Sequence, residues 1–139
     1  MYMPIWILYW FPFFLPINYG IKFIAINIVL WIYKKRQTSM IYSTATVIKI
    51  LCFTIVSELA GIAMFYFIEI NTETNFYYGN YFVFCLLAFL CVAILNFLLN
   101  YMFVFRKINY SNKQKFILVT SIVTVTAPYL FLLPSGVVY

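Results

Sequence analysis

Histidine is absent from this sequence, and acidic residues number only three among 139. Acid–base catalysis relies mainly on histidine and carboxylates, and zinc sites need His, Cys or carboxylate ligands. The three cysteines, Cys52, Cys85 and Cys91, form no CxxC pair and lie inside apolar runs, where we interpret them as buried small apolar residues. The sequence therefore predicts a protein that is not an enzyme and holds neither a metal nor a cofactor.

Charge of either sign is scarce. Charged residues make up 9% of the chain and hydrophobic residues 66%, with a mean hydropathy of +0.99, whereas about a quarter of a soluble domain is charged. The net charge of +6 comes from basic residues that flank apolar runs. Such flanks are where membrane topology signals lie, so we interpret these residues as topology signals and not as a nucleic-acid surface.

The longest apolar run is residues 81–105, which contains no charged residue. A helix over this run rises roughly 37 Å, enough to cross a hydrocarbon core of about 30 Å with some tilt. Three further spans are predicted at 15–33, 47–68 and 116–133, the last interrupted near its end by Pro128. We therefore expect an all-α membrane protein whose four transmembrane helices form one bundle over residues 15–139.

Residues 1–14 differ from these spans because they combine aromatic side chains with Pro4 and Pro12. Proline inside a helix removes a hydrogen bond and clashes with the preceding turn, while Trp and Tyr favour the membrane interface. This segment is predicted to be an interfacial or re-entrant helix that precedes the first span.

The basic residues predict the orientation of the chain. The 34–46 and 106–115 connections and their flanks carry eight of the nine basic residues, whereas the connection between the second and third spans carries only acidic ones. Cytoplasmic loops are enriched in Lys and Arg. We expect both basic loops in the cytoplasm of a cell-membrane protein and both termini outside.

A few polar residues fall at similar depth inside the predicted spans. At ~1.5 Å per residue, Lys22 lies roughly 18 Å and Glu58 about 14 Å from the cytoplasmic edge. Charges at the bilayer centre usually face the bundle and find a partner. We predict an intramembrane polar layer made of Lys22, Glu58, Asn96, Asn100 and Thr124. This layer would either hold the helices together or serve as a site for an anionic headgroup or a proton relay.

Small and polar residues accompany Glu58 on its helix. Thr54, Ser57, Glu58 and Gly61 follow i, i+3, i+4, i+7 spacing and define one narrow face. Ser57 and Gly61 form a small-xxx-small pair, which predicts close approach of another helix backbone at this point.

A short motif closes the longest span. Residues 96–107 read NFLLNYMFVFRK, with two asparagines one turn apart and Arg106 at the helix end. This motif resembles the end of the second helix of GtrA-like membrane proteins, and residues 49–67 resemble that family's first helix more loosely. The resemblance covers about residues 47–133, although Met64 stands roughly where the family has an Asp.

The resemblance implies a role in cell-surface polysaccharide synthesis. Such proteins are thought to assist translocation of a polyprenyl-phosphate-linked sugar, or to act as the membrane partner of a glycosyltransferase. The residues that could then hold a lipid phosphate are Lys34, Lys35, Arg36, Arg106 and Lys107, with Lys113 and Lys115.

Two other classes of protein stay open. A small proton-coupled exporter would use Glu58, and a structural subunit of a larger membrane complex would use Glu58 for assembly. In all three classes, four small helices with no soluble domain favour a protein partner or a homo-oligomer.

Overall fold

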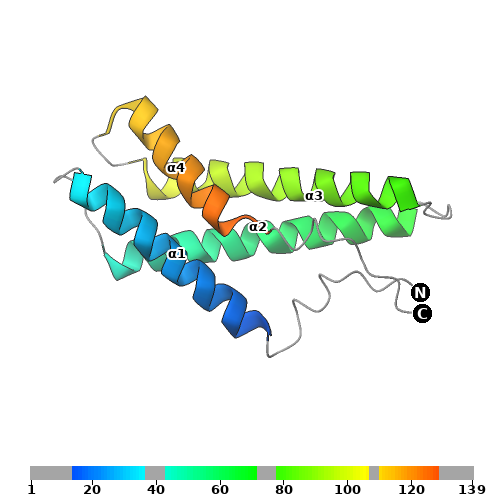
Figure 1. The fold of residues 1–139 in the computed structure, drawn as a ribbon. Coiled ribbons are helices and arrows are strands. Elements are labelled where there is room, and N and C mark those ends of the chain that lie inside the picture. Colours follow the sequence, from blue (N-terminus) through cyan, green and yellow to red (C-terminus); the bar gives the residue numbers. More distant parts are fainter. Residues whose placement is uncertain (1–13, 37–42, 72–77, 107–109, 129–139) are drawn as a thin grey trace.

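A computed structural model describes residues 14–36, 43–71, 78–106 and 110–128. These residues form helices and connecting turns, with no strand among them. The elements are α1 (Phe14–Arg36), α2 (Thr44–Asn71), α3 (Tyr78–Leu99), the π-helix η2 (Asn100–Val104) and α4 (Asn112–Thr126). Figure 1 shows α2 and α3 antiparallel and side by side, with α1 and α4 packed across them.

Three of these helices are long and apolar enough to cross a membrane: Pro16–Lys35, Thr44–Met64 and Val83–Val104. The prediction of an all-helical membrane protein is confirmed to this extent. The first helix starts one residue before the predicted span, and Pro16 lies in its first turn. Proline is tolerated there because the amide it lacks would have no partner inside the helix.

The fourth helix is shorter than the span predicted at 116–133. Helix α4 has 15 residues, a rise of about 22 Å, which is less than the hydrocarbon thickness. It ends at Thr126 because Ala127 precedes Pro128 and adopts an extended conformation with φ −56° and ψ 142°. The end of this predicted span, residues 129–133, and nearly all of the predicted aromatic segment (residues 1–13) lie outside the described residues.

The main core lies between the four helices at the end of the bundle that carries the basic connections. Its fully buried apolar members are Ile26 and Leu30 of α1, Val47 and Ile50 of α2, Phe105, and Leu118, Val119 and Ile122 of α4. Many other large apolar side chains are exposed, as expected for helices whose solvent is lipid. Of the cysteines, Cys85 is buried as predicted, but Cys52 and Cys91 are exposed on helix surfaces.

Gly61 is a point of close approach between α2 and α3. A Cβ atom built on Gly61 would overlap Cγ2 of Val92 and would lie 3.7 Å from Val92 Cβ and 4.0 Å from the carbonyl oxygen of Ala88. Valine is restricted to few rotamers in a helix, so its side chain cannot readily turn away. The predicted close approach at the small-xxx-small pair is therefore observed.

This contact predicts the effect of Gly61→Ala. The added methyl should force α2 and α3 apart and lower the free energy of unfolding by about 1–3 kcal/mol, measured by denaturant unfolding in detergent micelles. Gly20→Ala is the matched control because a Cβ at Gly20 meets no atom within 4 Å. It should leave stability unchanged or raise it, since alanine favours helix by up to about 1 kcal/mol over glycine. Equal destabilisation by both variants would contradict this account of the packing.

Candidate functional site

An ion pair between Lys22 of α1 and Glu58 of α2 is buried between the two helices. Both residues are 4% exposed, and Nζ of Lys22 donates to Oε1 of Glu58. The hydroxyl of Tyr19 donates to the second carboxylate oxygen at 2.7 Å. The ammonium of Lys22 also lies 5.4 Å from the centre of the Tyr19 ring, a distance at which the ring face attracts a cation. Both carboxylate oxygens are thus engaged by α1.

Helical periodicity places these groups on facing surfaces. Tyr19, Lys22 and Ile26 follow i, i+3, i+7 spacing on α1, so the polar pair continues the face that enters the core. On α2 the predicted narrow face is buried along its whole length: Thr54, Ser57, Glu58 and Gly61 are all inaccessible or nearly so. The sequence-predicted pairing of Lys22 with Glu58 is present, and Tyr19 is a partner that the sequence reasoning missed.

A second polar cluster joins α2, α3 and α4. Asn96 Nδ2 donates to the hydroxyl of Thr126 at 3.2 Å, and Asn96 Oδ1 accepts from Thr54 at 3.4 Å and from Asn100 Nδ2 at 2.7 Å. All four residues are buried, with exposures of 2% or less. The two clusters meet on α2, where Thr54 precedes Glu58 by one turn. Asn96 and Asn100 thus lie together as predicted, and Asn96 is the centre of this second cluster.

Thr124, by contrast, is not buried, unlike the other members of the predicted polar layer. It is exposed and donates to the carbonyl oxygen of Thr120 at 2.8 Å. The buried face of α4 contains Leu118, Val119, Ile122, Val123 and Thr126. Thr126 lies on this face, whereas Thr124 is two residues, or about 200°, away from it. Depth along the bundle does not determine the angular position around α4, which the apolar spacing of that helix indicates.

The motif at residues 96–107 contains a change of helix type. The amide of Phe105 donates to the carbonyl oxygen of Asn100 at 3.1 Å, an i to i+5 bond, and residues 100–104 form a π-helix. Asn100 Nδ2 also donates to the carbonyl oxygen of Asn96 at 2.9 Å. Single π turns inside longer helices are uncommon and frequently occur at functional sites.

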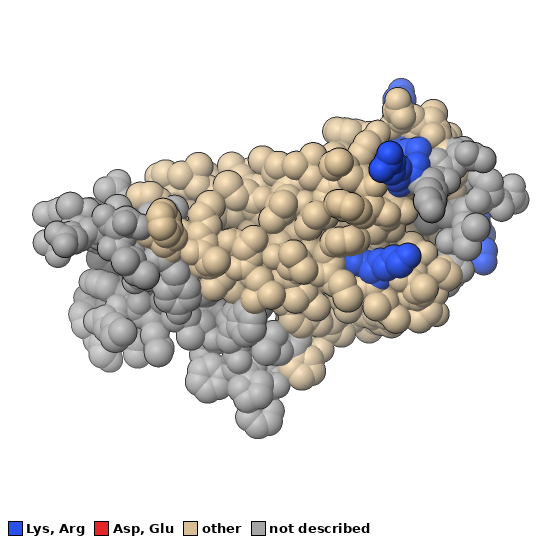
Figure 2. Space-filling view, turned by 180° about the vertical axis from the view of Figure 1, so that it is seen from behind, with Lys and Arg blue, Asp and Glu red and all other residues tan. Residues whose placement is uncertain are grey.

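The basic residues lie at one end of the molecule. Figure 2 shows Lys and Arg side chains gathered at the end where α1 and α3 finish and where α2 and α4 begin. Among the phosphate candidates Lys34, Lys35 and Arg106 are exposed, and the ammonium of Lys35 lies 5.2 Å from the ring centre of Trp31. Arg36 ends α1, and Lys107 lies outside the described residues.

A pocket of about 390 Å³ opens at this end, between η2 and the start of α4. It is lined by Tyr101, Met102, Phe103, Arg106, Asn112 and Lys115. The ring of Phe97 connects the two walls, stacking with Tyr101 at 5.8 Å and meeting Phe116 edge-on at 5.3 Å between centroids. The start of α4 is fixed by a capping box in which Ser111 and Gln114 exchange side-chain and backbone hydrogen bonds.

No protein-family model, curated protein or solved structure matches this chain. The resemblance to GtrA-like proteins therefore rests on the motif at residues 96–107 and stays a prediction.

The buried ion pair predicts non-additive effects of mutation. Lys22→Met and Glu58→Gln should each destabilise the protein by about 3–5 kcal/mol because each leaves a buried charge without its counter-charge. The double variant should cost clearly less than the sum, since it removes both charges together. Unfolding in detergent for the four members of this cycle measures the coupling. Additive single effects would show that the pair does not stabilise the junction of α1 with α2.

The second cluster predicts different effects on stability for substitutions of two neighbouring threonines. Thr126→Val removes the acceptor of Asn96 Nδ2 in a buried site and should lower stability by about 1 kcal/mol. Thr124→Val makes the same chemical change at an exposed position and should have little effect. The difference between their unfolding midpoints is the measurement, and a larger loss for Thr124→Val would reverse our assignment of the buried face of α4.

Proposed function

We propose that this protein is a GtrA-like membrane protein that assists translocation of a polyprenyl-phosphate-linked sugar, or that acts as the membrane partner of a glycosyltransferase, in cell-surface polysaccharide synthesis. The observation that carries the proposal is the concentration of basic side chains at one end of an apolar helical bundle. A lipid phosphate is an anion held at the membrane boundary, and each Lys or Arg near that boundary attracts it by about 1 kcal/mol.

The acidic residues do not neutralise this end. Glu58 is buried and paired with Lys22. Glu69 lies close to the end of α2, and the basic end of the molecule is at the start of that helix. The third acid, Glu73, belongs to the connection between α2 and α3. Of the two acids in the described part of the chain, Glu58 and Glu69, neither therefore lies at the basic end.

The proposed orientation follows from the same asymmetry. We propose that the 34–46 and 106–115 loops are cytoplasmic and that both termini are outside. The proposal includes a fourth span over residues 116–133, which would begin with α4, and an interfacial or re-entrant segment over residues 1–14. A lipid phosphate would then be recognised at the cytoplasmic face, where lipid-linked sugars carry their headgroups before translocation.

The surroundings of Glu58 favour assembly over proton exchange. A relay carboxylate must exchange protons with a water-filled path, whereas Glu58 is 4% exposed and both its oxygens are engaged by Lys22 and Tyr19. This arrangement supports a role for Glu58 in holding α1 against α2. It favours the translocation protein, or a structural subunit with the same bundle, over a proton-coupled exporter.

Reconstitution tests the proposal directly. Liposomes that contain a labelled polyprenyl-phosphate sugar on one leaflet are treated with a membrane-impermeant oxidant of the sugar. The protein, alone or with a co-reconstituted glycosyltransferase, should move the labelled sugar to the leaflet that the oxidant reaches. The sugar should then be oxidised faster than in protein-free liposomes. Thr124→Val serves as a control that is expected to keep full activity. Equal rates with and without protein would rule the proposal out, and proton-driven efflux by the wild-type protein would favour the exporter.

A further inference from the structure

We propose that the pocket between η2 and the start of α4 is the binding site for the phosphate of a lipid, with Arg106 and Lys115 as its cationic ligands. This inference rests on the proposed function for the class of ligand, and it adds the place where that ligand is held. Six residues line the pocket: Tyr101, Met102, Phe103, Arg106, Asn112 and Lys115.

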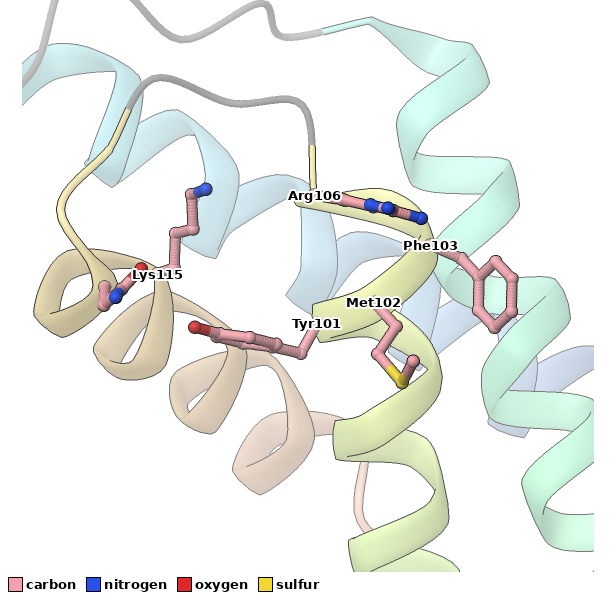
Figure 3. A pocket seen from close by; sticks show the side chains of 6 residues that line it. Tyr101, Met102, Phe103, Arg106 and Lys115 are labelled. Atoms are coloured by element: carbon pink, nitrogen blue, oxygen red, sulfur yellow. The ribbon is translucent and has the colours of Figure 1, made fainter.

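The fold brings the two cations to the pocket from separate elements. In Figure 3 the side chain of Lys115 rises from α4 on one side of the pocket, and the ring of Tyr101 extends from η2 toward α4. The side chain of Arg106 leaves the chain just after η2 on the other side and extends away from α4, on the side of Phe103. Lys115 is half-buried, whereas Lys49 and Lys113, at the same end of the molecule, are exposed and do not line the pocket. The partial burial of Lys115 distinguishes it from a freely solvated surface lysine.

The π-helix forms one wall of this pocket. Tyr101, Met102 and Phe103 belong to η2, and Arg106 follows its C-terminal end by two residues. The wider turn changes the direction in which these four side chains leave the helix, compared with an uninterrupted α3. The irregular backbone and the pocket therefore coincide, which is an observation independent of the charges.

The chemistry of the lining matches an amphipathic anion. Arg106 and Lys115 offer positive charge, and Asn112 and the Tyr101 hydroxyl offer hydrogen bonds. Met102 and Phe103 are 56% and 66% exposed, so they present an apolar surface beside the cations. Arg106 lies two residues beyond the candidate span Val83–Val104, at the level where a lipid joins its headgroup to its chain. The volume of about 390 Å³ is within the usual range for small-ligand sites.

Binding to nanodiscs tests this site. The full-length protein is placed in phosphatidylcholine nanodiscs that contain a small fraction of polyprenyl phosphate, at about 0.3 M salt so that distant charges are screened. Retained lipid is counted by native mass spectrometry. Arg106→Gln combined with Lys115→Gln should weaken binding at least about tenfold because two charge-assisted contacts are lost. Either single substitution should weaken lipid binding by a smaller factor. The single variants provide the test if the double variant does not accumulate.

The matched control is Lys49→Gln combined with Lys113→Gln. It removes the same charge from the same end of the protein but leaves the pocket intact, and it should weaken binding by less than about threefold. Equal losses in the pocket pair and the control pair would overturn the proposal, because lipid would then be held by the overall charge of the surface.

Two further probes identify the source of the phosphate. Polyprenol without its phosphate should not be retained, and inorganic phosphate should not displace polyprenyl phosphate at comparable concentration. Displacement by inorganic phosphate would overturn the lipid assignment. Retention of lipid by the wild-type protein without any translocation would refute the proposed function and leave the pocket in place. An unchanged translocation rate in the variant that combines Arg106→Gln with Lys115→Gln would refute the pocket site alone.

Discussion

The ion pair between Lys22 and Glu58 is the interaction on which the position of α1 depends. A charge buried among apolar helices is costly unless it is paired, and neither helix carries another charged residue at this depth. The pairing therefore fixes both the rotation and the height of α1 against α2, and Tyr19 makes the arrangement more specific by occupying the second carboxylate oxygen. Once α1 is fixed in this way, Ile26 and Leu30 enter the core, and α4 has a surface to pack against.

A second constraint acts between α2 and the other helices. Gly61 has no side chain at a point where α3 comes close, and Thr54, one turn before Glu58, contacts Asn96. Asn96 in turn binds Thr126 of α4. In surroundings with little water these hydrogen bonds specify which faces meet, whereas apolar contacts with lipid and with another helix differ little in energy. The absence of a side chain at Gly61 thus lets α2 and α3 pack closely, and a few polar groups hold the helices in register.

Much of this arrangement could be predicted from the sequence. Long apolar runs identified the three long helices, and simple depth arithmetic paired Lys22 with Glu58. The same arithmetic selected Thr124, whereas the buried threonine of α4 is Thr126, because depth carries no information about direction around a helix. Tyr19 could have been found, since it precedes Lys22 by three residues on the same face. The end of α4 at Thr126 was not predicted because Pro128 affects the residue before it as well as its own position.

The π-helix had no signal in the sequence, because its existence depends on how Asn100 and its neighbours pack after the fold has formed. Its geometry has a consequence for related chains of different length. A π turn is equivalent to one extra residue inserted into an α-helix, and one residue corresponds to about 100° of rotation. A homologue that lacks one residue between positions 100 and 104 would keep an intact helix and the same end, yet its terminal arginine would leave the helix in a different direction relative to α4. Length variation in this segment would thus alter the lining of the pocket while leaving the bundle itself unchanged.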